Sequence, residues 1–265
     1  MEKKEDNKKG NKGKKLSYLF LIVFIILLIF SSIKVFNYIR DSNKNKTITD
    51  KISKSIIVED TSDNNKNEKN NKYKIDFKTL KEQNSDTIGF IKVNGTDVET
   101  VVVKGNDNNY YLSHNFEKQS NVAGWIFADY RNKLDGTDKN IIIYGHNMRN
   151  NTMFGTLKNI LSKDWQENEE STYEVFSVYQ IEAEDYYIKV DFSKEGFKEY
   201  IDDMKSRSRF DFNVDVNEDD SILSLSTCAN DNKYRVVLHA KKLNKIFWTC
   251  SQKIHKKLAL YTWHC

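Results

Sequence analysis

Hydrophobic and polar positions divide this chain into an apolar segment near its start, a polar stretch, and a long region of short alternating runs. Residues 16–36 read LSYLFLIVFIILLIFSSIKVF, with no charge before Lys34. As a helix, the uncharged part would be roughly 27 Å long, enough to cross the hydrocarbon core of a bilayer. The run is longer than the apolar part of a usual signal peptide, and no small-residue cleavage site follows it. We therefore predict an uncleaved transmembrane signal-anchor helix over residues 16–36.

The segments on either side of this run give the expected topology and the next boundary. Residues 1–15 contain seven lysines against three acidic residues. The positive-inside rule therefore predicts a cytoplasmic basic tail there and places the rest of the chain outside the cell membrane. Residues 37–72 are largely polar, most of all from Thr61 onward, and such a sequence cannot bury a core. We expect a polar stalk or linker over 37–72.

From residue 73 to residue 243 the pattern predicts a folded domain of many short strands with a few inserted helices. Apolar residues alternate with polar ones in the strand-like runs and recur at helical spacing in the others. Strands are expected at 88–93, 98–104, 124–130, 141–144, 173–183, 186–192, 210–216, 221–228 and 235–241. Helices are expected near 77–80, after Thr152 as an N-cap, and over 193–208 with Ser193 as its cap. The fold class is mainly β with inserted helices, arranged as a closed or nearly closed β-barrel.

The last two of these runs contain the most distinctive chemistry. In 221–228, Ser224, Ser226 and Cys228 share one face because strand side chains alternate. If the hairpin is symmetric about its polar loop, Arg235 lies directly opposite Cys228, with Cβ atoms roughly 5 Å apart. A guanidinium stabilises a thiolate and supplies a donor for an oxyanion. The pattern favours a cysteine nucleophile, although a lone cysteine is also often a small buried hydrophobe.

A cysteine nucleophile needs a partner that exchanges protons near neutral pH, and His146 is the leading candidate. It follows the apolar strand 141–144 and Gly145. A histidine there could instead simply cap a turn. The other histidines compete poorly, because they lie along a predicted strand wall, in an irregular polar stretch or in the tail: His239, His114, His255 and His264.

Composition and motifs argue against several other functions. The net charge of +4 is modest and much of it lies at the N-terminus, so nucleic-acid binding has no support. No metal-ligand spacing, phosphate-cradling glycine loop or dinucleotide fingerprint is present, and no cofactor is expected. Of the three cysteines, Cys250 and Cys265 lie in the tail, so no disulfide framework can hold the domain together.

Three short motifs together resemble the sortases, most closely class B: YGHNM with a helix behind it, LSTC, and an arginine seven residues on in RVVLHAK. The runs IGFIKVNGTDVETVVVKGNDNNYYL and GWIFADYRN are similar to the opening strands of that family. The predicted helix 193–208 is similar to the insertion that marks class B. The resemblance extends over residues 73–243, and the N-terminal anchor agrees with it.

The resemblance implies an extracytoplasmic cysteine transpeptidase on the surface of a Gram-positive bacterium. Cys228 would be the nucleophile, His146 the general acid/base, and Arg235 the oxyanion or substrate-orienting residue. The enzyme would cleave a C-terminal sorting signal of surface proteins, N-P-x-T-N-like or S/P-P-x-T-G-like, after its threonine. A thioester would then pass to an amine on a peptidoglycan precursor. Neighbours of the motif residues are candidates for lining the substrate groove: Tyr144, Ser226, Thr227, Asn147 and Met148.

Some alternatives stay open. Tyr144 is equally well explained by core packing. The family usually ends soon after the HAK strand, whereas this chain continues through residues 244–265. That tail would be a membrane-surface helix, a disulfide-closed loop or a sequence without function. A membrane-anchored binding module without catalysis and a housekeeping or pilus-building sortase of another class are the competing functions.

Overall fold

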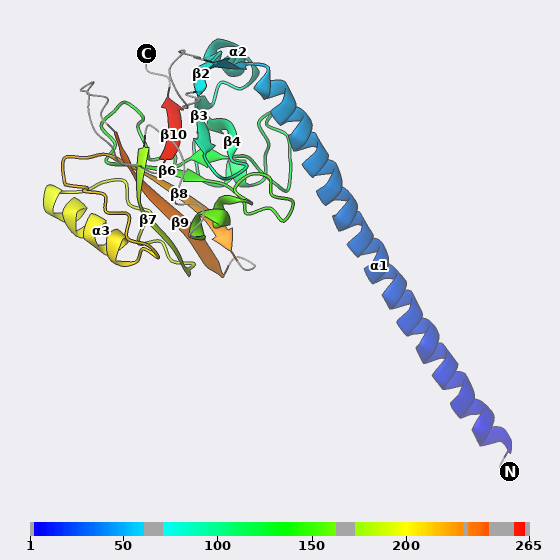
Figure 1. Cartoon of the computed structure of the whole chain (residues 1–265). Helices are drawn as coiled ribbons and strands as arrows, with labels where there is room; N and C mark the ends of the chain where they lie inside the picture. Colours follow the sequence, from blue (N-terminus) through cyan, green and yellow to red (C-terminus); the bar gives the residue numbers. More distant parts are fainter. Residues whose placement is uncertain (1–2, 61–70, 163–172, 230–232, 244–256, 263–265) are drawn as a thin grey trace. The chain divides into compact units, whose positions relative to one another are not determined.

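The computed structural model describes residues 3–60, 71–162, 173–229, 233–243 and 257–262 (Figure 1). The chain forms two compact units, residues 1–44 and residues 45–265. The second unit contains seven of the nine strands predicted from the alternating runs. A mainly β fold with inserted helices is therefore confirmed.

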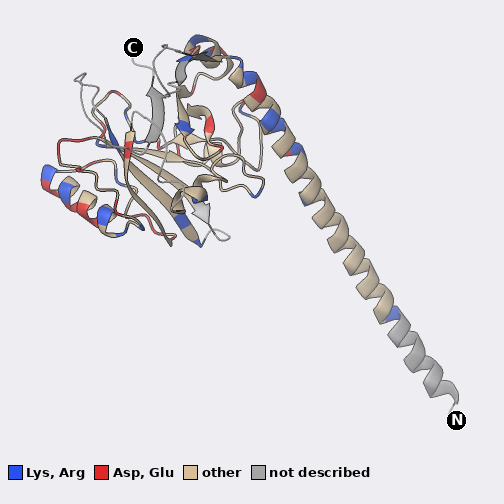
Figure 2. Ribbon diagram, in the orientation of Figure 1, with Lys and Arg blue, Asp and Glu red and all other residues tan. Residues whose placement is uncertain are grey.

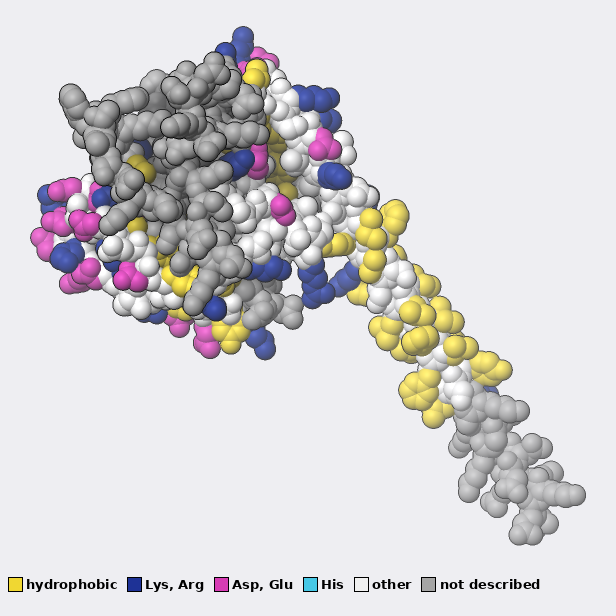
Figure 3. Space-filling model, viewed as in Figure 1, with side chains coloured by type: hydrophobic (Ala, Val, Ile, Leu, Met, Phe, Trp, Pro, Cys, Tyr) yellow, Lys and Arg dark blue, Asp and Glu magenta, His cyan; other side chains and the backbone are white. Residues whose placement is uncertain are grey.

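Helix α1 spans Lys3–Ser53. Between residues 16 and 36 its large hydrophobic side chains are exposed, and Figure 3 shows them around the helix. The most apolar stretch has a mean hydropathy of 2.9 over 18 residues. Within the described residues, this is the one helix that length and composition would allow to cross a membrane. It can serve as the membrane anchor expected from the sequence.

Part of the predicted polar stalk is ordered and packed. Helix α1 continues to Ser53, and Ile48 and Ile52 are buried. Strand β1 (Ile56–Asp60) then pairs with β2 (Asn71–Ile75) in an antiparallel ladder. Polar composition concealed this packing because only a few apolar residues in the segment carry it. Residues 61–70, the most polar part, lie outside the described residues.

The main sheet joins strands from the whole of the second unit. Its hydrogen-bonded order is β10-β3-β4-β5-β6-β8-β9-β7, and β10 also pairs with β7, so the pairings close into a ring. Most neighbours are antiparallel, whereas the β4–β5 and β6–β8 pairs are parallel. The strands are β3 (Thr87–Val93), β4 (Glu99–Val103), β5 (Phe127–Ala128), β6 (Asn140–Tyr144), β7 (Tyr173–Glu182), β8 (Ile222–Ala229), β9 (Tyr234–Lys242) and β10 (Lys257–Thr262).

Strand β10 comes from the tail whose role the sequence left open. Its residues pair with β3 from Leu258↔Val93 to Thr262↔Gly89. None of the three interpretations of residues 244–265 included a strand of the main sheet, and the domain therefore extends beyond its predicted end at residue 243. The run KLALYT is short and has little alternation, so its pattern alone did not indicate a strand. Cys250 and Cys265 lie outside the described residues.

Two predicted strands, 186–192 and 210–216, are irregular loops. Their backbone carbonyls bind side chains instead of a neighbouring strand: the Tyr200 hydroxyl donates to Tyr187 O (2.8 Å), and Asn140 Nδ2 donates to Lys189 O (2.9 Å). In the second loop, Lys241 Nζ donates to Asp215 O (2.8 Å). The alternating apolar residues still pack inward, which explains why the pattern imitated a strand.

Two of the three predicted helices are present, and each begins directly after a capping residue. Helix α2 (Phe77–Gln83) is capped by Asp76, and helix α3 (Lys194–Ser206) is capped by Ser193, whose Oγ accepts from Gly196 N at 3.1 Å. Helix α3 buries its predicted apolar stripe and presents charges of both signs to solvent (Figure 2). The helix predicted after Thr152 is wrong. Met153 has a left-handed φ of 54°, which no right-handed helix accommodates. Among the described residues up to 162, the short 3₁₀ helix η2 (Leu157–Leu161) is all that follows.

Candidate active site

Strand register brings the three predicted catalytic residues to one end of adjacent strands. Cys228 and Arg235 are Cα partners across the antiparallel pair β8–β9, as the symmetric hairpin predicted. On the other side of β8, Tyr144 pairs with Ser226 in the parallel β6–β8 ladder. His146 lies two residues after Tyr144, and Cys228 lies two residues after Ser226. Both residues are therefore at the carboxyl end of the parallel β6–β8 pair. The structure describes Cys228 by its backbone.

A tight turn after β6 holds His146. The His146 carbonyl oxygen accepts from Met148 N (3.1 Å) and Phe154 N (2.9 Å), which closes the turn on itself. Gly145 precedes it, and a Cβ at that position would lie 2.7 Å from the Phe154 ring. Since real Cβ atoms do not approach so closely, glycine is required for this packing. Asn147, paired with Met153 in an isolated bridge, and the largely buried Met148 belong to the same turn.

The imidazole of His146 is oriented by a backbone carbonyl. Its Nε2 lies 2.8 Å from the carbonyl oxygen of Leu112, at the end of the 3₁₀ helix η1 (Tyr110–Leu112). A carbonyl only accepts hydrogen bonds, so Nε2 carries the proton and donates. In the neutral ring, Nδ1 is then the nitrogen with a free lone pair. This is the tautomer that leaves Nδ1 to accept a proton.

Tyr144 is joined to a buried carboxylate. Its hydroxyl donates to Asp129 Oδ2 at 2.7 Å, and Asn108 Nδ2 donates to the same oxygen at 3.0 Å. Arg131 binds both oxygens of Asp129, through Nε at 2.9 Å and Nη2 at 2.7 Å. Burial by itself raises the pKa of Asp129. The hydrogen bonds from Arg131, Tyr144 and Asn108 together outweigh this effect and lower the pKa to about 2. Burial and the neighbouring carboxylate raise the pKa of Tyr144, so it stays a neutral hydroxyl.

Ser226 and Thr227, the other groove candidates, are both buried. The Ser226 hydroxyl lies 2.8 Å from the hydroxyl of Tyr187. Thr227 lies on the opposite face of β8, and its Oγ1 makes no hydrogen bond to any described residue. Ser226 therefore already has a protein partner, whereas the Thr227 hydroxyl has unused bonding capacity directly before Cys228.

The other histidines that the structure describes, His239 and His114, are held by contacts within the folded domain. His239 is fully buried: its Nδ1 lies 2.7 Å from Ser224 Oγ, and its Nε2 lies 2.9 Å from the Tyr179 hydroxyl. Burial lowers the pKa of His239 to about 3, so it is neutral at physiological pH. His114 stacks on the Tyr110 ring at a centroid distance of 4.0 Å and is partly buried. His255 and His264 lie outside the described residues.

Comparison with known proteins gives a consistent answer. A family model described as Sortase domain matches residues 91–243. Sortase B of Listeria monocytogenes serovar 1/2a (strain ATCC BAA-679 / EGD-e) is 33% identical over 247 residues, which are 88% of this chain and 97% of that protein. The chain belongs to the sortase family.

Two further relatives place this sortase in class B. Sortase B of Staphylococcus aureus (strain NCTC 8325 / PS 47) is 34% identical over 179 residues, 62% of this chain and 73% of that protein. The X-ray structure of Clostridium perfringens sortase B is 40% identical, covers 63% of this chain and 100% of its own, and superimposes with a TM-score of 0.59. The chain is accordingly a class B sortase-type cysteine transpeptidase.

Sequence reasoning missed the residues that support the sortase site. Asp129, Asn108 and Arg131 surround Tyr144, and the Leu112 carbonyl binds His146. Asp129 lies directly after the strand in GWIFADY, and a carboxylate two residues before an arginine was a weak signal of an ion pair. The Leu112 carbonyl gave no signal, because a backbone group has no residue type. In the described residues, no cluster of three or more His, Cys, Asp or Glu could hold a metal ion.

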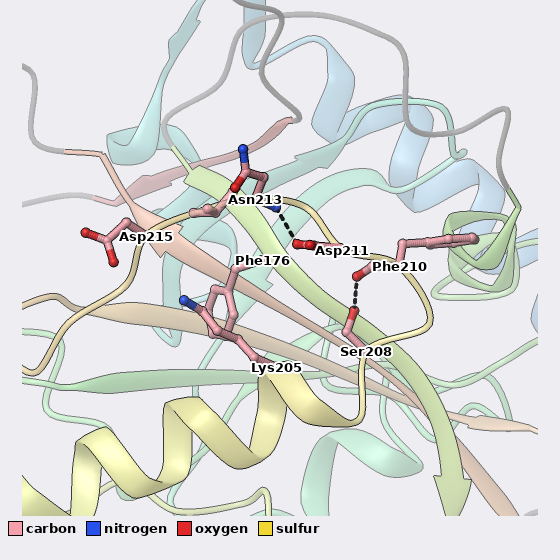
Figure 4. Close-up of a pocket in the computed structure, with 8 residues that line it drawn as sticks. Phe176, Lys205, Ser208, Phe210, Asp211, Asn213 and Asp215 are labelled. Carbon is pink, nitrogen blue, oxygen red and sulfur yellow. Dashed lines mark hydrogen bonds between the residues drawn. The ribbon is translucent and has the colours of Figure 1, made fainter.

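A pocket of 420 Å³ lies away from the predicted catalytic residues (Figure 4). It is formed by β7, the end of α3 and the loop after α3, and Phe176 and Lys205 line one side of it. Phe176 lies between the partners of Ala240 and His239 in β9, whereas Arg235 pairs with Ile181 further along β7. The pocket is therefore not the site of the proposed cysteine chemistry.

Proposed function

We propose that this sortase cleaves the C-terminal sorting signal of surface proteins after its threonine and transfers the new carboxyl end to a peptidoglycan amine. The signal would be N-P-x-T-N-like or S/P-P-x-T-G-like. Cys228 would be the nucleophile, His146 the general acid/base and Arg235 the residue that stabilises the oxyanion or orients the substrate. The observation that carries this proposal is the register that brings His146, Cys228 and Arg235 to one end of three adjacent strands of a sortase-like β-barrel.

The chemistry divides a difficult amide exchange into two steps. The Cys228 thiolate attacks the threonine carbonyl carbon, and the guanidinium of Arg235 stabilises the negative charge that develops on the oxygen. When the C–N bond breaks, protonated His146 delivers a proton to the departing amine, leaving a thioester. The acceptor amine then attacks the thioester carbonyl, His146 takes the proton from that amine, and the Cys228 thiolate leaves.

The tautomer of His146 fits this role. Its Nε2–H is bound to the Leu112 carbonyl, so the proton would be exchanged at Nδ1. Tyr144, Ser226 and Thr227 would line the substrate groove on either side of the strand ends. Thr227 offers a buried hydroxyl without a partner among the described residues, and Tyr144 offers a neutral hydroxyl held by Asp129.

The same proposal includes a location. The apolar part of α1 would span the cell membrane once, with the lysine-rich N-terminus in the cytoplasm and the catalytic domain outside a Gram-positive cell. The exposed hydrophobic side chains along residues 16–36 support it. A cysteine introduced at Ser85, in the catalytic domain, should react with a membrane-impermeant maleimide in intact cells in a background in which Cys228, Cys250 and Cys265 are all replaced by alanine. A cysteine introduced at Asn7 should react only after the cells are opened.

Intact-mass spectrometry tests the reaction directly. The full chain in detergent would be mixed with candidate sorting peptides and no amine acceptor. The expected result is a mass gain equal to the N-terminal peptide fragment in the wild type and none in Cys228→Ala. If a folded protein forms no adduct with any of the peptides, the assignment of Cys228 as nucleophile for this substrate class is wrong. A binding module without catalysis would then gain support.

A further inference from the structure

Asn45 is a buried polar residue near the end of α1 that the proposed chemistry does not use. Its side chain lies in the second compact unit and is 1% exposed. Nδ2 donates to the carbonyl oxygen of Gly124 at 3.2 Å, and Oδ1 accepts from Asn121 Nδ2 at 2.9 Å. The donor and the acceptor of the Asn45 amide are thus both bonded to the loop that contains Asn121 and Gly124. A buried amide of this kind fixes the position of the groups it binds, because separating them would leave polar atoms unpaired.

The loop that Asn45 binds is packed directly against the backbone around Leu112. Asn121 N donates to Ser113 O at 2.8 Å. Gly124 has a positive φ of 55°, and a Cβ there would lie 2.8 Å from the carbonyl oxygen of Leu112. The two backbone segments are therefore in close contact at Gly124. A shift of the Gly124 peptide moves the neighbouring Leu112 carbonyl as well.

The Leu112 carbonyl oxygen is the acceptor for Nε2 of His146 at 2.8 Å. We propose that Asn45 is a positioning residue for His146, acting through Gly124 and the Leu112 carbonyl. Asn45 holds the Gly124 peptide against Leu112, and the Leu112 carbonyl holds the imidazole in the tautomer with Nδ1 free. This inference rests on the proposed role of His146 as general acid/base.

Other contacts of the same helix segment separate this role from simple attachment. Ile48 and Ile52 are buried one and two turns further along α1, and Lys51 Nζ forms an ion pair with Glu117 at 3.0 Å. The ion pair attaches the helix to the domain through Glu117 and not through Gly124. Loss of Asn45 should therefore change the position of the loop backbone while the helix stays docked.

The kinetic test compares two variants of the full chain in detergent micelles, with thioester formation on a sorting peptide as the readout. Asn45→Ala should lower kcat by about 10-fold, because a misplaced catalytic group loses the near-attack geometry, and should leave KM within about 2-fold of the wild type. Lys51→Ala is the matched control: it breaks the exposed ion pair of the same helix segment and should keep the wild-type kcat. The thermal midpoints of both variants are measured alongside.

A spectroscopic readout is independent of turnover. In protein labelled with ¹⁵N-histidine, long-range ¹H–¹⁵N correlation spectra distinguish the two tautomers, and the His146→Gln variant identifies the His146 signals. The wild type and Lys51→Ala should show His146 with the proton on Nε2, whereas Asn45→Ala should show a mixture of tautomers. If the wild type forms no thioester, the proposed function fails while this spectrum still decides the role of Asn45.

The outcomes that overturn the inference are equally defined. A folded Asn45→Ala protein with the wild-type kcat and the wild-type tautomer would refute it, as would equal losses in Asn45→Ala and Lys51→Ala. Should Asn45→Ala not fold, Asn45→Asp decides the question. That variant is isosteric, keeps the acceptor for Asn121 and removes the donor to Gly124. It should show the same loss of kcat with the KM retained, and wild-type kinetics in this variant would also refute the inference.

Discussion

Cys228 and Arg235 are Cα partners across the β8–β9 pair, seven residues apart in sequence. Arg235→Ala should lower the rate of thioester formation by about 100- to 1000-fold, the usual cost of removing one oxyanion donor. Arg235→Lys keeps the charge but loses the planar fork of donors, so it should recover only part of the rate. The measurement is adduct formation by mass spectrometry over time. Arg209→Ala, in the loop after α3, should behave as the wild type. An equally active Arg235→Ala would remove Arg235 from the mechanism.

Gly145 tests the turn that carries His146. In Gly145→Ala the new methyl group would lie 2.7 Å from the Phe154 ring, which is fully buried and cannot retreat. We expect the His146 turn to shift, with kcat about 10-fold lower or more and the thermal midpoint reduced. Gly105→Ala is the control, since its methyl group would meet only ordinary contacts at 3.5 Å. Wild-type turnover in Gly145→Ala would show that the turn adapts without moving the imidazole.

Asp129 should make the stability of the domain depend on pH under acidic conditions. Its pKa in the folded protein is about 2, against an ordinary value of 3.8. A carboxyl whose pKa is lowered by folding stabilises the folded state above its ordinary pKa, and this contribution is lost as the pH falls through the folded value. The difference is worth about 2 kcal/mol.

Urea unfolding at several pH values between 5 and 2 measures this contribution of Asp129. In Asp129→Asn the free energy of unfolding should be lower at pH 5 and should fall less between about pH 4 and pH 2. Parallel curves for the wild type and the variant would contradict the assignment. Tyr144→Phe, which removes one of the hydrogen bonds to Asp129, should show an intermediate dependence.

His239 should produce a second, less acidic window of pH dependence. Burial lowers its pKa to about 3, whereas in the unfolded chain the imidazole has an ordinary value of 6.5. The unfolded state therefore binds a proton first, and stability falls as the pH decreases from about 6.5 toward 3. In His239→Gln this part of the dependence should disappear. His114→Gln, which replaces a histidine that is only partly buried, should retain it. A His239→Gln protein with the full wild-type slope would refute the prediction.

The parts of the fold that sequence predicted well are those in which local pattern and tertiary contacts agree. The hairpin around Cys228 and Arg235 has strict alternation and a polar loop, and helix α3 has both a capping serine and an apolar stripe. The segments 186–192 and 210–216 failed because alternation reports which side chains face inward, not whether the backbone has a strand partner. The backbone carbonyls of these two segments accept hydrogen bonds from side chains such as Tyr200 and Lys241 instead of from a neighbouring strand.

One part of the candidate site could likewise be predicted from the sequence, and another part could not. Cys228, His146 and Arg235 could be selected because their chemistry is specific to their residue types. Their meeting at one end of the sheet depends on the parallel pairing of β6 with β8, which joins segments about eighty residues apart and leaves no trace in local sequence. The contacts of Asn45 and of the Leu112 carbonyl are also long-range, and each has a backbone carbonyl as its acceptor.

The buried bond between Ser224 and His239 also determines how the hairpin is aligned. These two residues are Cα partners four residue pairs along the hairpin from Cys228 and Arg235, and Ser224 Oγ further donates to Asn140 Oδ1 at 2.7 Å. A slip of one residue would move these polar groups to the opposite face of the sheet and leave them without partners. Substitutions of this interior serine or histidine can therefore change the alignment of Cys228 with Arg235 from within the core, and directed-evolution libraries confined to the surface of the groove would never sample them.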